Sequence, residues 1–183
     1  LGAVARWLPL GPVDLHAGGI ALPALVVLAA RDKDYAPPIL LAALLADLPC
    51  DVMDLGIVSD ELDAMTAAFA RATQADIIVS TGGASVGDHD LVRPAFAAAG
   101  GALDFWKIRM RPGKPLMAGT LGKSLFLGLP GNPVSAFVTG ALFLLPLVRH
   151  LSGAGRPLPF LTDAALASPL PATGDRDDYL RSH

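Results

Sequence analysis

Three glycine-rich turns hold the residues best suited to chemistry in this chain: STGGASVGDHD (80–90), RMRPGKP (109–115) and GLPGNPVSA (128–136). Each joins an apolar run to a new element and exposes backbone N–H groups beside a charged or hydroxyl side chain. Glycine lets the backbone approach a ligand closely, and a helix N-terminus favours negative charge. Together the three turns predict a site for a phosphorylated or oxyanionic ligand.

The first turn combines a glycine-rich backbone with acidic side chains. The backbone of residues 82–87 and the Ser85 hydroxyl would bind a phosphate or nucleotide group. Asp88 or Asp90 would hold a hard cation such as Mg²⁺, which takes oxygen ligands. The alternative is an ordinary strand-to-helix turn in which Asp90 only caps the following helix.

The second turn concentrates positive charge. Lys107, Arg109, Arg111 and Lys114 are four of the chain's 14 basic residues, although the net charge of the chain is −3. This cluster predicts the positive potential that an anionic ligand needs. A solvated strand edge is the alternative, since charges are common there.

The third turn predicts a helix start. Asn132 is a good N-cap and Pro133 a good first helical residue. Ser135 would then lie in the first helical turn, where its hydroxyl and nearby N–H groups can meet an oxyanion.

The elements that position these turns alternate between strand-like and helix-like runs, which favours an α/β fold with a mostly parallel sheet. Strands are predicted at 24–30, 50–56, 76–80 and 102–111, with a hairpin about Gly122 and Lys123. Helices are predicted at 37–48, 61–73, 91–99 and from Asn132 to His150. Asp60 is placed to cap the second of these helices.

Composition restricts the class of protein. The chain has 183 residues, of which 52% are hydrophobic and 17% charged, as in a globular domain. The weak negative charge argues against nucleic acid as a partner. The apolar segment 134–148 falls short of the ~20 residues that span a bilayer. With no secretory signal at the start and a single cysteine, Cys50, we expect a cytoplasmic protein that is not membrane-bound.

The turns at 81–90, 109–115 and 128–136 together resemble the molybdopterin molybdenumtransferase family, to which the C-terminal region of gephyrin is related. DLGIVSD (54–60) fits the same pattern, and the match covers residues 24–151. The resemblance implies a three-layer molybdopterin-binding α/β domain at 23–152. Residues 157–183 would begin a small C-terminal β-barrel domain, and residues 1–22 would be a connector from a preceding domain.

The resemblance also implies an activity, namely a Mg²⁺-dependent transferase of molybdenum cofactor biosynthesis. It would insert molybdate into adenylylated molybdopterin and release AMP. Asp60 and Asp90 would be catalytic, and Asp88 and Asp90 would bind the metal. The implied substrate-binding residues are Gly82, Gly83, Ser85, Gly87, Arg111, Lys114, Pro115, Asn132, Ser135 and Arg181, with Arg176 as the alternative to Arg181.

The expected assembly is a homodimer, with molybdopterin adenylyltransferase as a possible further partner. The segment 134–148 is apolar on nearly all sides, and a sheet can cover only one of them.

Two features keep alternatives open. VVLAA (26–30) runs directly into RDKDYAPP (31–38), where the family carries an acidic TGDEL-like loop, and Arg111 stands where the family usually has lysine. The alternatives are a molybdopterin adenylyltransferase of the same fold and a noncatalytic molybdopterin-binding or scaffold module.

Overall fold

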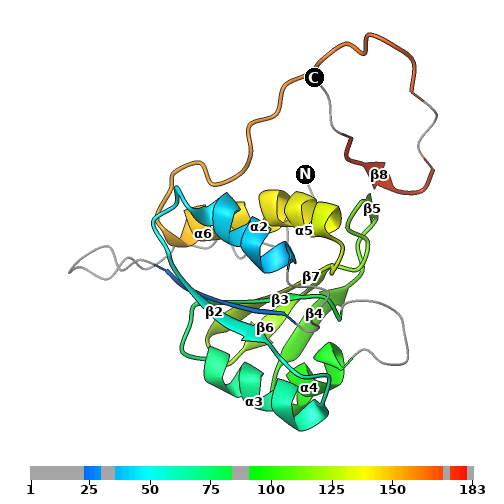
Figure 1. The fold of residues 1–183 in the computed structure, drawn as a ribbon. Helices are drawn as coiled ribbons and strands as arrows, with labels where there is room; N and C mark the ends of the chain where they lie inside the picture. The colour runs from blue at the N-terminus through cyan, green and yellow to red at the C-terminus, as the bar shows by residue number, and fades with distance from the viewer. Residues whose placement is uncertain (1–22, 30–35, 84–90, 171–173, 181–183) are drawn as a thin grey trace.

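The computed structural model describes residues 23–29, 36–83, 91–170 and 174–180. Its main sheet has the strand order β2-β1-β3-β7-β6-β4 (Figure 1). Strands β2, β1, β3 and β7 are parallel neighbours, and β6 and β4 extend the sheet antiparallel. The strands are β1 Ala24–Ala29, β2 Asp51–Ile57, β3 Ile77–Thr81, β4 Ala102–Trp106, β6 Met117–Leu121 and β7 Ser124–Leu129. The predicted α/β class with a mostly parallel sheet is confirmed.

Helices cover both faces of this sheet, which gives three layers (Figure 1). Helix α2 (Ala36–Leu45) and a long helix over Pro133–Leu151 lie on one face. Helices α3 (Leu62–Ala72) and α4 (Val92–Ala98) lie on the other. Each interface has its own core of buried side chains, so the sheet is packed on both faces.

The sequence pattern explains the position of each element. All five residues of β3 are buried, as expected for a continuous apolar run in the middle of a parallel sheet. Strand β2 lies at the edge of the sheet and is mostly exposed. Helix α3 buries residues at helical spacing, namely Met65, Ala68, Phe69 and Ala72. The single cysteine, Cys50, is half-buried, and burial, followed by the neighbouring Asp51, raises the pKa of its thiol.

The long helix has three parts: α5 (Pro133–Thr139), a π-helical turn η2 (Gly140–Leu144) and α6 (Leu145–Leu151). It is longer than the segment 134–148 and, by length and composition alone, could cross a membrane. Its residues Phe143, Leu144, Leu147 and Val148 are instead part of the core against the sheet. It also packs closely on α2, since a Cβ on Gly140 would lie 2.6 Å from Leu41 Cδ2.

The prediction of one strand over 102–111 is wrong. Strand β4 ends at Trp106 because Lys107 has a left-handed backbone with φ 77°. A separate two-residue strand, β5 (Met110–Arg111), pairs in parallel with β8 (Asp177–Asp178) near the end of the chain. Side-chain burial still alternates along 106–111, as in a strand, with Lys107, Arg109 and Arg111 exposed.

Residues 155–170 form neither helix nor strand, and β8 is the only regular element within 174–180. The β-barrel domain over 157–183 therefore remains a prediction. The predicted connector, residues 1–22, lies outside the described residues.

Candidate functional site

The described parts of the three glycine-rich turns meet at one edge of the main sheet. Thr81 at the end of β3 is in register with Leu129 at the end of β7, and the Gly82 N–H donates to the Leu129 carbonyl at 3.1 Å. Gly128 is in register with Met117 at the start of β6, and Met117 is in register with Trp106 at the end of β4. In open α/β sheets, ligands bind at the carboxyl ends of the parallel strands.

The third turn is a capped helix start, as predicted. The Asn132 side chain accepts a hydrogen bond from the Ser135 N–H at 3.1 Å. The Ser135 hydroxyl also contacts the Asn132 Oδ1, at 3.3 Å. Asn132 thus fixes both the first helical turn and the position of the Ser135 hydroxyl, which stays partly accessible and keeps acceptor capacity for a ligand.

The second turn packs directly against this helix. Gly113 has φ 111°, and a Cβ there would lie 2.5 Å from Thr139 Cγ2. The Ile108 N–H donates to the Lys114 carbonyl at 2.9 Å, which closes the turn. The turn therefore needs a glycine at 113 for two reasons, its backbone conformation and the close approach of the helix.

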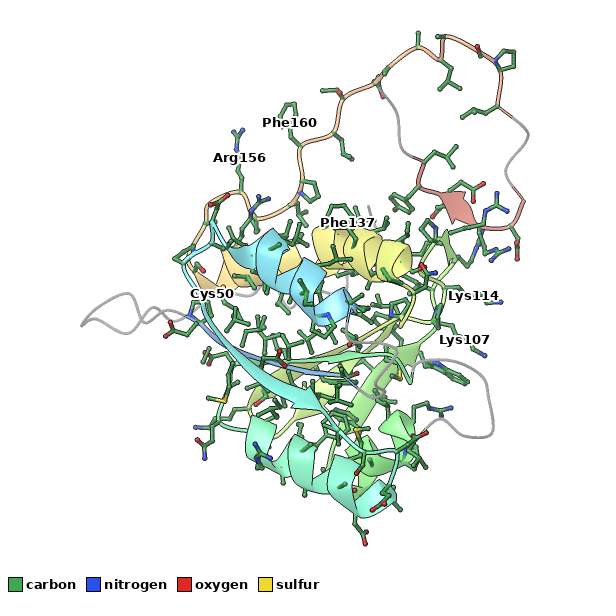
Figure 2. All side chains as sticks on the ribbon, viewed as in Figure 1. Cys50, Lys107, Lys114, Phe137, Arg156 and Phe160 are labelled. Carbon is green, nitrogen blue, oxygen red and sulfur yellow. The ribbon has the colours of Figure 1, made fainter. Side chains whose placement is uncertain are left out.

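We use the name basic turn for residues 107–114. Two of its four cations lie on the side of the turn that Figure 2 shows facing solvent, Lys107 and Lys114. The Lys107 Nζ lies 3.8 Å from the centroid of the Trp106 ring, and the Arg93 guanidinium lies 4.0 Å from it, both within cation–π range. Lys114 is exposed and makes no side-chain hydrogen bond or ion pair with the residues that the structure describes.

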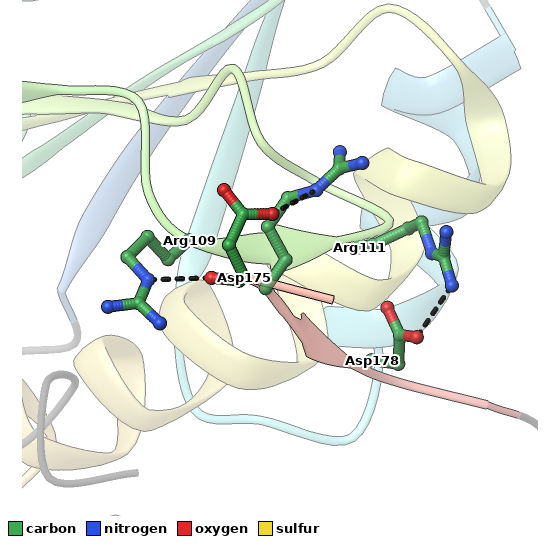
Figure 3. Close-up of polar contacts among 5 residues, drawn as sticks. Arg109, Arg111, Asp175 and Asp178 are labelled. Atoms are coloured by element: carbon green, nitrogen blue, oxygen red, sulfur yellow. Dashed lines mark hydrogen bonds and ion pairs between the residues drawn. The ribbon is translucent and has the colours of Figure 1, made fainter. Parts of the chain in front are cut away.

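The other two cations face residues 174–180, which we call the strap (Figure 3). The Arg111 Nη2 lies 2.6 Å from Asp178 Oδ2, and the Asp178 side chain is only 10% exposed. The Arg109 Nε donates to the Asp175 carbonyl at 2.8 Å. Arg111, predicted to bind substrate, is therefore already paired with a carboxylate.

The strap is held by its backbone and by Tyr179 as well. The Asp177 N–H donates to the Arg109 carbonyl at 3.0 Å, and the Tyr179 N–H donates to the Arg111 carbonyl at 2.8 Å. Tyr179 packs against the core on that side of the sheet. Burial, followed by the charge of Asp177, raises the pKa of the Tyr179 hydroxyl.

Two buried hydroxyls lie at the carboxyl end of β3. Ser80 and Thr81 are fully buried, and neither side-chain oxygen has a hydrogen-bond partner among the described residues. Burying a hydroxyl without a hydrogen-bond partner is costly, so buried hydroxyls usually have one. Both residues lie directly before Gly82, at the carboxyl end of β3.

Asp60 also lies at the carboxyl ends of the strands, but several strands away from the three turns. It follows β2, whose residue Ile57 pairs with Ala29, while Ala29 also pairs with Thr81. From β2 to β7 there are three strand spacings, or ~14 Å at ~4.8 Å each. The structure therefore does not bring Asp60 next to Ser135 through adjacent strands. The helix prediction is also corrected: the N-cap of α3 is Glu61 and not Asp60.

Several predicted site residues cannot be placed. Ser85, Gly87, Asp88, Asp90 and Arg181 lie outside the described residues. Gly82 is buried, and Gly83 and Pro115 are partly buried. Within the described ranges, no three His, Cys, Asp or Glu side chains gather as a metal site. The Mg²⁺ ligands predicted at Asp88 and Asp90 therefore stay a prediction.

Sequence reasoning missed three features of this edge. It did not find the cation pair on Trp106, the orphaned hydroxyls of Ser80 and Thr81, or the pairing of Arg111 with Asp178. Only the last left a signal in the sequence, since GDRDDY (174–179) is an acidic run in a chain with a concentrated basic turn.

The sequence of the chain is similar to those of known proteins. Residues 32–150 match a family model described as "Probable molybdopterin binding domain". A molybdopterin molybdenumtransferase of Haemophilus influenzae is 43% identical over 111 residues, which are 60% of this chain and 27% of that protein. One from Nostoc is 35% identical over 145 residues, which are 76% of this chain and 33% of that protein. The chain thus spans about a third of the length of these curated relatives.

A solved structure has the same fold. The molybdopterin biosynthesis moea protein from Pyrococcus horikosii matches with a TM-score of 0.62 at 24% identity, covering 73% of this chain and 36% of that one. At this identity the likeness concerns the fold alone.

Proposed function

Because the chain belongs to the family of probable molybdopterin binding domains, we propose that it acts in molybdenum cofactor biosynthesis, inserting molybdate into adenylylated molybdopterin with release of AMP. The curated relatives described above carry the name of this transferase. The substrates would be molybdate and the adenylylated pterin, in a cytoplasmic protein that works as a homodimer. The chain spans about a third of the length of these relatives, so the activity of the whole relatives comes to it only as a proposal.

The observation that supports this function best is that the described parts of the three glycine-rich turns meet at the carboxyl ends of the parallel strands. There, the N-terminus of the long helix, capped by Asn132, presents its positive end beside Ser135. The basic turn packs on the same helix through Gly113. This arrangement suits an oxyanion, which can be held by cations, backbone N–H groups and a hydroxyl without forming a covalent bond to the protein.

Within this site we assign the oxyanion contact to Lys114. It is exposed on the basic turn and makes no ion pair with a described residue, whereas Arg111 is paired with Asp178. Ser135 would turn its hydroxyl hydrogen from Asn132 Oδ1 to the oxyanion.

The first prediction tests this assignment. Lys114→Ala should weaken tungstate binding by about 1.5–3 kcal/mol, the scale of a charge-assisted hydrogen bond. Tungstate serves as the probe because it has the shape and charge of molybdate, and calorimetry measures its affinity. The matched control is Lys123→Ala, which removes the same charge from the exposed hairpin between β6 and β7 and should leave the affinity unchanged. Unchanged binding in Lys114→Ala would contradict the assignment.

The second prediction concerns the metal. When bound, Mg²⁺ would neutralise phosphate charge on the adenylylated substrate, and Asp88 and Asp90 would hold it through oxygen atoms. The N-cap of α4 is Leu91, without a side-chain cap, so the predicted capping role of Asp90 is not found. Asp90→Asn keeps the size of the side chain and removes its charge, so the variant should fold normally. It should nevertheless lose Mg²⁺-dependent cofactor synthesis. Wild-type turnover in this variant would show that the charge of Asp90 is not needed for the metal.

Two alternatives can be separated in the same assay. An adenylyltransferase of this fold would consume ATP and molybdopterin, whereas the proposed transferase releases AMP from molybdopterin that is already adenylylated. A noncatalytic scaffold would bind the pterin and release no AMP. AMP release from adenylylated molybdopterin, measured with and without molybdate, identifies the proposed transferase. ATP consumption with unmodified molybdopterin then separates the adenylyltransferase from the scaffold.

A further inference from the structure

The strap and the basic turn have complementary charges. The basic turn carries four cations and no acidic residue, while the strap has Asp175, Asp177 and Asp178 against one arginine, Arg176. The two segments lie side by side through the β5–β8 pairing. Such pairing of segments far apart in the sequence places a net negative charge next to the cations assigned to an anionic ligand.

The contact involves the chemical group that an oxyanion would use. A guanidinium binds a carboxylate and a tetrahedral oxyanion through the same N–H donors. At 2.6 Å from Arg111 Nη2, the Asp178 carboxylate occupies one of these donors. Asp178 is mostly buried, whereas the Arg111 side chain is 59% exposed and can still turn toward solvent.

The strap is attached by a short strand pairing, by the packing of Tyr179 and by the contacts of Arg109 and Arg111. Its strand is two residues long and pairs with a strand of two residues, and an isolated two-stranded sheet is marginally stable. The described residues before it, 155–170, are largely exposed and form no helix or strand, so they give it little support.

We propose that Asp178 is an internal competitor for Arg111, so that an oxyanion bound at the basic turn displaces the strap. This inference rests on the proposed function, because it assumes that the basic turn binds an oxyanion. By linkage, each of the two events opposes the other. The docked strap lowers the affinity for the oxyanion, and the bound oxyanion weakens the docking of the strap by the same factor.

The test is the tungstate affinity of Asp178→Asn, measured by calorimetry in the full chain. Removing the carboxylate should tighten binding about threefold to tenfold, the scale of a partly exposed ion pair or charged hydrogen bond. The matched control is Asp177→Asn, which removes the same charge one residue away from an exposed position that contacts the basic turn through its backbone only. Its affinity should stay within about twofold of wild type, since exposed charges are well screened.

Asp178→Glu keeps the charge and should restore an affinity close to wild type, which guards against a general effect of changing the strap. Circular dichroism should show the same fold in all three variants. If Asp178→Asn binds as Asp177→Asn does, Asp178 does not compete. If it binds more weakly than wild type, Asp178 positions Arg111 for the ligand, and the competition is again overturned.

Failure of this inference can be told apart from failure of the proposed function. A loss of affinity in Lys114→Ala with no change in Asp178→Asn would overturn the competition and leave the oxyanion site in place. Unchanged affinity in Lys114→Ala would remove the site itself.

Discussion

Gly113 joins the basic turn to the long helix, and its substitution should show how tightly the two are packed. Alanine at this position must adopt φ 111° and would place its Cβ 2.5 Å from Thr139 Cγ2. We expect Gly113→Ala to lower the free energy of unfolding by about 2–5 kcal/mol, the sum of a backbone cost of about 1–2 and an overpacking cost of about 1–3. Chemical denaturation measures this loss.

Gly100→Ala is the matched control. Gly100 also has a positive φ, 91°, but a Cβ there would have nothing within 4 Å. It should therefore lose only the backbone cost of about 1–2 kcal/mol. Equal losses in the two variants would mean that the helix yields to the added methyl group, and that the turn is not fixed by this contact.

At this scale the sequence predicts what depends on near neighbours. The Asn132 cap could be foreseen because an N-cap and the N–H that it accepts from are three residues apart. The partner of Arg111 could not be foreseen, because Asp178 lies 67 positions away and no local sequence pattern predicts a contact over that separation. The pairing of Arg111 is thus an addition from the structure, while substrate binding by Arg111 and Lys114 stays a prediction.

Among the elements, the strap offers a titration of its own. The pKa of the Tyr179 hydroxyl is raised, first by burial and then by Asp177. A raised pKa in the folded protein means that the neutral phenol is favoured by folding. Its contribution to stability is complete below the ordinary pKa of about 10 and is lost as the pH rises through the higher folded value.

The expected outcome is a phenolate absorbance midpoint in the folded protein above the midpoint in denaturant. Tyr35→Phe makes Tyr179 the single tyrosine of the chain, which has two, so the signal can be assigned. Adding Asp177→Asn should lower the folded midpoint only part of the way, since burial is the larger cause. Equal midpoints in the folded and unfolded states would show that Tyr179 is not held against the core in solution.

The regular elements follow from the sequence with one exception. Predicted and observed helices and strands agree within a few residues where apolar periodicity is strong, as in α3 and β3. The strand predicted over 102–111 fails because alternation of side chains records burial and not backbone conformation. The residues alternate in exposure, yet the chain turns at Lys107, which has a positive φ. A lysine, unlike a glycine, gives no indication of this conformation in the sequence.

At the scale of the whole molecule, the exposed side of the long helix concerns how copies of the chain assemble. One side of the long helix lies on the sheet, but Val134 and Phe137 remain 58% and 46% exposed. We predict a homodimer in which this surface is covered, so Phe137→Asp should give the mass of a monomer by light scattering where the wild type gives that of a dimer. A stable interface buries at least about 1,000 Å² in total, and a central charge disrupts it.

Leu62→Asp is the control, because Leu62 is 43% exposed on α3, in the helical layer on the opposite face of the sheet. It should leave the mass unchanged. A wild-type chain that is monomeric at micromolar concentration would contradict the dimer, and so would a Phe137→Asp variant that remains dimeric.

The layered architecture and the meeting of the turns at one edge could be predicted because parallel strands place their carboxyl ends together. The distance of Asp60 from the long helix could not be predicted, because the order of the strands depends on crossover connections that no sequence pattern indicates. Strand β2 lies at the outer edge of the sheet beyond β1.

The two-residue pairing of β5 with β8 also has a consequence for the time over which parts of the chain exchange amide protons with solvent. The amides of Asp177 and Tyr179 are protected by single bonds to Arg109 and Arg111. Detachment of the strap exposes both while the sheet stays intact, so they should exchange early and together. The amides of β3, buried between β1 and β7, should exchange only when the whole domain unfolds. Deuterium would thus enter the end of the chain long before it reaches the centre of the sheet.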